Sequence, residues 1–419
     1  MSKYFNKKSV FLFFLMLFLE LLMIFALGHK NGFENIFFRG DGRDYQNLAN
    51  NLIYHHTLAI TAQPPYLPTS FRPPFYPYWL SLIYLIFHSF IPAIFIGATV
   101  FAFSAPLVYL IGKEIFSEKT AFIAAAISAI EPWALYQAGF IAAEQIFMPI
   151  FLLSIYFFCL YLKNHKTRHL YLSAVFLAFS ALIRPISLYF IAILIFLAFV
   201  FELKKSFWRS IKISGLAFLI FFLILSPWLA RNKIILKTWQ FSSASGLSLF
   251  NDYFELEKYL GRFDAKNDLY EYARKITGAK TDDKAITTVE NSKKLSDFAI
   301  KGIADNPYAF FIMHFLKNTP LFLIGNSYGN IMLDLGLPYR IIKVFLFIFW
   351  PAIVLLAVFG IYYRFKNDEY ALSWFLIFWI LYFTFLTASA RDVSRYKLAI
   401  NAPLFMLAVY GFIKIKNFF

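Results

Sequence analysis

The sequence predicts an all-α integral membrane protein with about ten transmembrane helices, in a range of roughly nine to twelve, and shorter helices along the outer face. Two observations support this prediction. Hydrophobic residues occupy 60% of the 419 positions and aromatic residues 21%, whereas only 15% are charged. That is more apolar than a soluble fold can cover with polar surface. Several apolar runs also reach the ~20 residues that a bilayer core requires, so a soluble globular domain is excluded.

The longest apolar runs define the predicted spans. They are 10–28, 91–112, 120–136, 145–162, 169–183, 186–203, 211–229, 340–363, 370–390 and 397–413. The first follows three lysines and is longer than the apolar region of a cleaved signal peptide, so we expect a retained anchor. A further apolar helix, 75–90, begins after Pro73 and Pro74, which suit the start of a helix.

The basic residues predict the orientation. A net charge of +16 would suggest nucleic acid in a soluble protein, but here Lys and Arg lie largely between apolar runs. They therefore favour topology signals and contact with membrane lipids, and no nucleic acid. If 75–90 does not cross, the basic short loops and both termini face the cytoplasm, while 29–72 and 230–339 face outside. We expect 75–90 to lie along the outer surface or to dip in and return; whether it crosses stays open.

The predicted location is the inner (plasma) membrane, multi-pass, with the functional residues on the outer, periplasmic face. One basic cluster opposes the positive-inside rule, because Arg391, Arg395 and Lys397 fall outside. These residues are either anchors that reach the headgroups or functional groups.

Three regions follow from the pattern. Residues 1–230 form a membrane-embedded catalytic module that includes the first external loop, 29–90. Residues 231–339 form an external loop with an interfacial helix, Tyr308 to Ile324, which we expect Lys317, Asn318 and Pro320 to break. The polar stretch Asp252 to Asp305 within this loop is compatible with helix but too polar to embed. Residues 340–419 hold the C-terminal transmembrane helices.

The first polar motif follows the first span. Asp41 lies between two glycines and precedes an amphipathic helix that carries Tyr45, Leu48, Ala49 and Leu52 on one stripe. Asp41 is placed like an N-cap, and it either caps this helix or supplies a reactive carboxylate. Asp44 lies one turn further on, where like-charge repulsion would raise the pKa of either acid, or where it is merely solvated.

The second motif is the proline-rich stretch Thr69 to Pro77. Its prolines stiffen the chain where it enters the membrane surface. Arg72 is thereby held at headgroup depth, where a guanidinium suits bidentate contact with a phosphate. It is either a phosphate ligand or a general headgroup anchor.

The third motif brings Glu131 and Glu144 to the outer end of a helical hairpin, without a basic neighbour in the sequence. Arg184 and Arg231 reach the same predicted level from later hairpins. A carboxylate at a membrane boundary usually has a partner or a function. Glu20, inside the first span, would also need a partner, and we interpret it as structural.

Common catalytic motifs are absent: there is no Walker loop, no H-E-x-x-H, no G-x-S-x-G and no dinucleotide fingerprint. The single cysteine, Cys159, excludes a disulfide within the chain. His55 and His56 are an isolated pair, which disfavours a metal site.

The order of the motifs resembles that of the GT-C glycosyltransferases that use polyprenyl-phosphate donors. The motifs are G-D-x-x-x-Y-x-x-L-A-x-x-L from Gly40, R-P-P-x-Y-P from Arg72, E-Q-I-F from Glu144 where relatives commonly show T-E-x-L-F, I-R-P from Ile183, P-W-x-x-R-N from Pro227 and S-R-Y-K from Ser394. The protein O-mannosyltransferases and the bacterial lipid A aminoarabinose transferases are the most similar groups. Each motif is degenerate alone, but their order covers nearly the whole chain.

The resemblance implies a role for each matching residue. Asp41 matches the catalytic base of the family, Arg72 the cation that contacts the carrier phosphate, and Glu144 a second acid lining the same cavity. Further candidates for substrate or phosphate binding are Arg184, Arg231, Arg395, Tyr396 and Tyr45, with Asp44 as a secondary candidate. Some relatives have Asp-Glu at the first motif, whereas Gly42 follows Asp41 here, so the role of that Glu is unassigned.

The resemblance predicts an inverting transfer of one sugar from a polyprenyl-phosphate carrier to a glycolipid, glycan or protein. No metal is expected to be essential, although a divalent ion stays possible. The absence of a separate soluble acceptor domain tilts the choice toward a glycolipid or glycan. The alternatives are a transporter or flippase of lipid-linked sugars, and an envelope polysaccharide polymerase or ligase.

Overall fold

The computed structural model describes residues 6–33, 38, 40–264, 268–279, 288–325, 328–336, 339–367, 369–388 and 393–416, with backbone alone for 339–347 and 393. The regular structure in these ranges is helical, which confirms the predicted fold class. Arg391, part of the predicted basic cluster, lies outside the described residues.

Eight helical segments in the described part of the chain are long and apolar enough to cross a membrane. They are Lys7–Asn31 (α1), Ile91–Ile115 (α5, Ile91–Phe101, and α6, Ser104–Ile115), Glu144–Asn164 (α9), Pro185–Leu203 (the 3-10 turn Pro185–Ser187 and α11, Phe190–Leu203), Phe207–Leu236 (α12), Ile348–Lys366 (within α19, Tyr339–Lys366), Tyr370–Thr387 (α20) and Ser394–Lys416 (within α21, Val393–Lys416).

One of the predicted spans differs from the structure. Segment 120–136 is not one helix, because α7 ends at Ala129 (Glu118–Ala129) and α8 begins at Pro132 (Pro132–Ala138). Proline has no backbone N–H and suits the first turn of a new helix, and the Glu131 carboxylate caps that turn by accepting from the Ala134 N–H at 2.7 Å. Segment 169–183 forms α10 (Thr167–Ile183), an apolar helix of 17 residues, at the short end of the range for a span, and it packs against α9.

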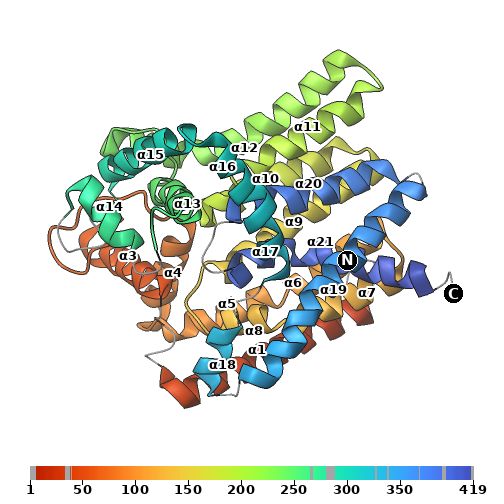
Figure 1. Ribbon diagram of the computed structural model, residues 1–419, viewed down its shortest axis with the longest axis horizontal. Coiled ribbons are helices and arrows are strands. Elements are labelled where there is room, and N and C mark those ends of the chain that lie inside the picture. Colours follow the sequence, from red (N-terminus) through yellow and green to blue (C-terminus); the bar gives the residue numbers. More distant parts are fainter. Residues whose placement is uncertain are drawn as a thin grey trace.

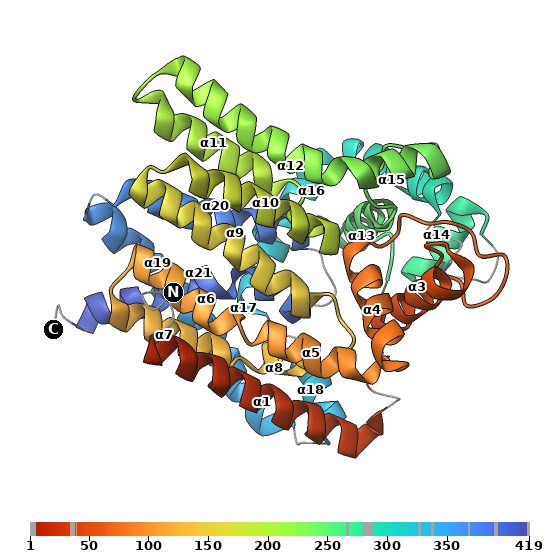
Figure 2. The same cartoon turned by 180° about the vertical axis from the view of Figure 1, so that it is seen from behind.

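The outer helix predicted over 75–90 forms α4 (Phe75–Phe87). Its 13 residues give a length of about 20 Å, which is too short to cross a hydrocarbon core of about 30 Å. Tyr78, Leu82 and Ile86 are more than half exposed along one side of this helix. Both views place α4 beside α3 (Asp41–His55), at the end of the molecule away from the C-terminus (Figure 1, Figure 2).

Three helices of the polar loop form a small unit at the same end as α3 (Figure 1). They are α13 (Ala244–Tyr259), α14 (Leu269–Thr277) and α15 (Val289–Ala304). Phe250, Phe254, Leu269 and Leu295 pack between them as a cluster separate from the main core. The helical character expected for this polar stretch is therefore confirmed.

The segment after α15 runs back into the helical bundle. It contains α16 (Pro307–Phe311), a π-helical stretch (Ile312–Asn318), α17 (Thr319–Ile324) and α18 (Gly329–Leu335). We expected Lys317 and Asn318 to break this helix. Instead, the helix continues through both residues in the wider π-helical turn, and Pro320 lies in the first turn of α17.

We call residues 321–325 and 328–336 the strap. Its polar contacts reach the helices beneath: Tyr328 donates to Glu131, Tyr136 donates to Asp334, and the Lys397 ammonium donates to the Leu323 carbonyl at 2.9 Å and to the Gly325 carbonyl. Tyr328 and Ile331 are each 1% exposed, so these two strap residues belong to the core, whereas Leu321 and Leu333 are exposed. Glu131 thus has a neutral phenol as its partner.

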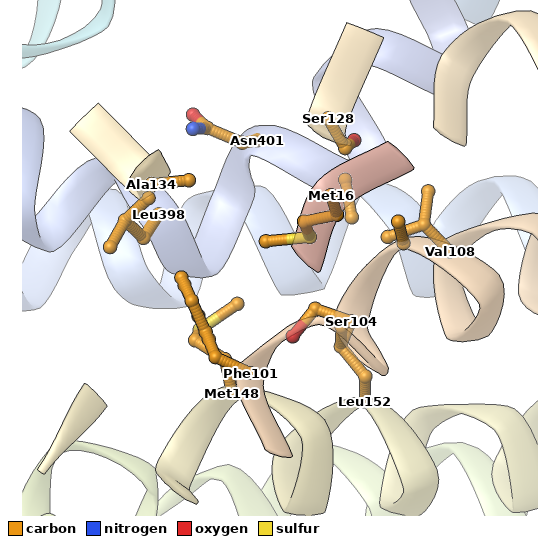
Figure 3. Close-up of a pocket in the computed structure, with 12 residues that line it drawn as sticks. Met16, Phe101, Ser104, Val108, Ser128, Ala134, Met148, Leu152, Leu398 and Asn401 are labelled. Carbon is orange, nitrogen blue, oxygen red and sulfur yellow. The ribbon is translucent and has the colours of Figure 1, made fainter. Parts of the chain in front are cut away.

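Buried polar side chains also occur deeper in the bundle. Ser104, Ser128 and Asn401, from α6, α7 and α21, line a cavity of about 30 Å³ together with Met16 of α1 (Figure 3). This volume matches about one water molecule. Glu20, which we expected to need a partner, is fully buried on α1 and makes no hydrogen bond to the described residues.

Candidate active site

Asp41 lies in the first turn of α3. It is the first helical residue, and Gly40 occupies the N-cap position with a positive φ of 60° that favours glycine. The prediction that Asp41 caps the helix is therefore wrong. Its side chain is turned to two arginines instead, in a first turn where the helix dipole favours negative charge.

Arg72 contacts both acids of this first turn. Its Nη2 atom lies 2.7 Å from Asp41 Oδ1 and 3.3 Å from Asp44 Oδ2. The guanidinium lies over the Phe71 ring, 4.6 Å from its centroid, and 5.4 Å from the centroid of the Tyr45 ring. The predicted grouping of acid and arginine in the first external segment is present as a compact cluster.

Arg395 joins the two halves of the site. Its Nη2 atom donates to Asp41 Oδ2 at 2.6 Å, while its Nε donates to Glu144. Arg184 donates to the same carboxylate of Glu144. Glu144 has no basic neighbour in the sequence, and the partner expected for it is supplied by two arginines that are distant in the sequence.

These contacts form one chain of alternating charge, from Arg72 through Asp41, Arg395 and Glu144 to Arg184. We call these five residues the charged cluster. Its members come from α3, the Pro-rich loop, α9, α21 and the residue that follows α10. Side chains of Asp41 and Arg72 remain 25% and 18% exposed, so a polar ligand can reach them.

The arginines control the ionisation of Asp41. Burial alone would raise the pKa of Asp41, but the charges of Arg72 and Arg395 outweigh burial and hold that pKa well below its usual range. The expected rise from the neighbouring Asp44 is therefore wrong for Asp41, since Arg72 lies between the two acids. Burial and repulsion by Arg395 lower the pKa of Arg184 to about 10.

Comparison with known proteins found one family model and several solved structures that this chain resembles. A family model described as dolichyl-phosphate-mannose-protein mannosyltransferase matches residues 71–230. An Archaeoglobus fulgidus oligosaccharyltransferase structure, tethered with an acceptor peptide containing the NVT sequon, superimposes with a TM-score of 0.50 at 14% identity, over 99% of this chain and 51% of that chain. Residues 71–230, less than half of the chain, thus resemble this mannosyltransferase family, and the fold resembles that of the oligosaccharyltransferase.

Two further solved structures are similar to this chain at lower scores. One is oligosaccharyltransferase AglB from the same archaeon in complex with an inhibitory peptide and a dolichol-phosphate (16% identity, TM-score 0.49, 94% of this chain and 50% of that chain). The other is ArnT from Cupriavidus metallidurans bound to undecaprenyl phosphate (12% identity, TM-score 0.41, 96% and 77%). The chain spans about half the length of the two archaeal proteins. No curated protein sequence matches it.

The two tyrosine candidates flank the charged cluster. Tyr45 is buried and lies edge-on to Tyr76, with ring centroids 4.6 Å apart. Tyr396 lies under Arg184, whose guanidinium carbon is 5.7 Å from the ring centroid. Each ring thus orients one arginine through its face.

Arg231 holds a position outside the charged cluster. Its Nη1 atom donates to the Thr69 carbonyl at 2.8 Å, and its guanidinium lies 5.0 Å from the Trp228 ring centroid. The Ser242 hydroxyl donates to the Phe71 carbonyl at 2.8 Å from the same side. Both contacts fix the backbone immediately before Arg72. Sequence analysis missed Ser242, because no motif marks it.

Within the described ranges, no three His, Cys, Asp or Glu side chains come together in a way that could hold a metal ion. His55 stacks on Tyr66 with centroids 3.9 Å apart. Two atoms of the cluster, Arg72 Nε and Glu144 Oε2, are buried and make no hydrogen bond to the described residues.

Proposed function

We propose that this chain transfers a single sugar from a polyprenyl-phosphate carrier to an acceptor on the outer face of the membrane, with inversion and with Asp41 as general base. The observation that supports this most is the division of the Asp41 carboxylate between Arg72 and Arg395. It brings a base and phosphate-binding cations together at one site. The family model adds a dolichyl-phosphate sugar as the class of donor.

The donor phosphate and Asp41 compete for the same guanidinium groups. A phosphate presents oxygens that suit the planar fork of arginine as well as a carboxylate does. When the phosphate binds Arg72 and Arg395, Asp41 loses the charges that depress its pKa, and its basicity rises. The site is thus a weak base without donor and a stronger base with it.

The transfer then needs one displacement at the anomeric carbon. The acceptor hydroxyl attacks this carbon, the bond from carbon to phosphate oxygen breaks, and the polyprenyl phosphate leaves with the electron pair. Asp41 takes the hydroxyl proton. The arginines stabilise the charge that grows on the leaving phosphate. Attack opposite the leaving group inverts the anomeric centre.

The outer-face location rests on charge. The short loops rich in Lys and Arg favour the cytoplasm, and the end of the molecule that holds α3 lies away from the C-terminus in both views (Figure 1, Figure 2). The exposed apolar side of α4, next to Arg72 in the chain, is the surface on which we place the polyprenyl tail. The sugar and the acceptor stay open among glycolipid, glycan and protein.

The deciding experiment measures sugar transfer from a radiolabelled polyprenyl-monophosphate donor in membranes that contain the protein. Asp41→Asn should abolish transfer, while Asp305→Asn, an exposed acid on the surface, should leave it unchanged. The amount and folding of both variants are checked by size-exclusion chromatography in detergent. Full sugar transfer by the Asp41→Asn variant would show that Asp41 is not the general base. Movement of intact donor across the bilayer without cleavage would favour the transporter.

A further inference from the structure

A second groove lies at the end of the bundle near the C-terminus, away from the charged cluster. It is lined by residues of α7, α19 and α21 and has a volume of about 360 Å³. Its lining residues are Lys119, Ile123, Ile127, Ile353, Leu356, Ala408, Val409, Phe412, Ile413 and Lys416. Figures 1 and 2 show the ends of α7 and α19 beside the C-terminus.

The shape of the groove follows from short side chains on its floor. Helix α21 packs against both α7 and α19. Ala408 and Val409 are buried and small, so α21 leaves a depression that longer side chains border. Ile123 and Ile127 border it on α7, and Ile353 on α19. The stripe from Lys119 to Ile127 is about 12 Å long, which suits an extended hydrocarbon chain.

The two cations of the groove lie at one end. Lys119 is in the first turn of α7, and Lys416 is the last residue of α21. Both side chains are exposed, and the described lining of the groove contains no acidic residue. The neighbouring acid Glu118 is already paired with Lys8, at 2.8 Å. One end of the groove is therefore positively charged, because no acidic residue of the described lining neutralises Lys119 and Lys416.

An apolar channel with a cationic end is complementary to one kind of molecule in a bilayer. We propose that this groove binds an anionic phospholipid, with one acyl chain along Ile123 and Ile127 and the phosphate between Lys119 and Lys416. Two lysines distinguish an anionic headgroup from a zwitterionic one, because each lysine near the surface attracts net negative charge. The site is separate from the charged cluster and does not depend on the proposed function.

The test measures retained lipid. The full-length protein is reconstituted in equal parts of phosphatidylglycerol and phosphatidylcholine and extracted in mild detergent. The phospholipid that stays bound is then quantified by mass spectrometry. We expect phosphatidylglycerol to be enriched about tenfold or more. The double variant Lys119→Gln/Lys416→Gln should retain both lipids equally. The matched variant Lys166→Gln/Lys204→Gln, which removes two exposed lysines elsewhere, should keep the enrichment.

Two further arms separate the headgroup from the acyl chain. Ile127→Trp fills the groove and should lower retention of phosphatidylglycerol while the thermal unfolding temperature stays close to that of the parent. Raising the salt concentration should weaken the enrichment, because exposed charges are screened. Equal retention of both lipids by the parent, or equal loss of enrichment in both lysine double variants, would overturn the proposal.

Discussion

Arg395 and Lys397 lie two residues apart on α21, yet they belong to polar networks of different kinds. Arg395 connects two carboxylates, Asp41 and Glu144, in a charged cluster that solvent partly reaches. Lys397 is 1% exposed, and it donates to the backbone of the strap while its ammonium lies 3.8 Å from the Trp350 ring centroid. The partners of Arg395 can be exchanged for a ligand, whereas the partners of Lys397 are fixed carbonyls.

The difference teaches how to separate function from stability in a membrane protein. Ionic partners with solvent access can be replaced by a phosphate at little cost, because the guanidinium stays paired. A buried cation on carbonyl oxygens has no such replacement, and its loss leaves polar groups without partners. We therefore expect the charged cluster to control the reaction and the strap network to control stability.

The largest expected effect is that of Arg395→Met on the rate. Transfer should fall about 10²–10³-fold, as is typical when one donor to a developing charge is removed. Stability should change little, because Asp41 keeps Arg72 and Glu144 keeps Arg184 as partners. The initial rate of transfer and the thermal unfolding temperature in detergent are measured together. A variant that loses stability instead of rate would contradict the comparison.

Arg72→Ala and Arg231→Ala test which of the two arginines contacts the donor phosphate. Arg72 would contact the donor directly, so its loss should raise KM for the donor about 10- to 100-fold. Arg231 contacts the Thr69 carbonyl, two contacts away from the donor, and its loss should raise that KM less than about tenfold. KM for the acceptor serves as the control in both variants. Equal effects on donor KM would place Arg231 at the phosphate.

Contacts between residues that are close in the sequence could be predicted, whereas contacts between distant residues could not. Most spans follow from hydropathy, because the bilayer requires long apolar runs. The break at Pro132 was missed, since apolar runs lie on both sides of Glu131 and Pro132 and their summed length suits one span. Asp41 and Arg72 are close in sequence and their grouping was expected. The contact of Arg395 with Glu144 joins positions 251 residues apart, which no local pattern encodes.

The strap was missed for a related reason. Only residues 321–324 of the strap belong to the predicted interfacial helix, and the rest of the strap was assigned only to the external loop 231–339. Only the packed structure brings Tyr328 to Glu131 and Lys397 to the Leu323 carbonyl. Burial of such polar groups depends on helices that meet after the chain has folded, so composition alone places them at the surface.

Lys397→Met should have the opposite profile to Arg395→Met. It removes the donor to two buried carbonyls of the strap, at a cost of about 1–3 kcal/mol in the free energy of unfolding. The rate of transfer by the folded fraction should stay close to that of the parent. Thermal unfolding and limited proteolysis of the strap are measured, with the exposed Lys166→Met as control. An unchanged unfolding temperature together with a large loss of the transfer rate would show that Lys397 acts in the reaction, like the residues of the charged cluster.

The pH dependence gives the smallest and most specific effect. In the folded protein without donor, the pKa of Asp41 lies below its unfolded value of about 3.9. The stability from its ion pairs is therefore complete above that pH and is lost as the pH falls toward the folded pKa.

The acid limb of kcat/KM reports the free enzyme and should lie below the ordinary range of aspartate. The acid limb of kcat reports the donor complex, in which the phosphate has taken the arginines, and should lie at higher pH. Rate profiles over pH 3–8 are measured. If the acid limbs of kcat and kcat/KM coincide, Asp41 has the same environment with and without donor, and the donor phosphate does not replace Asp41 on Arg72 and Arg395.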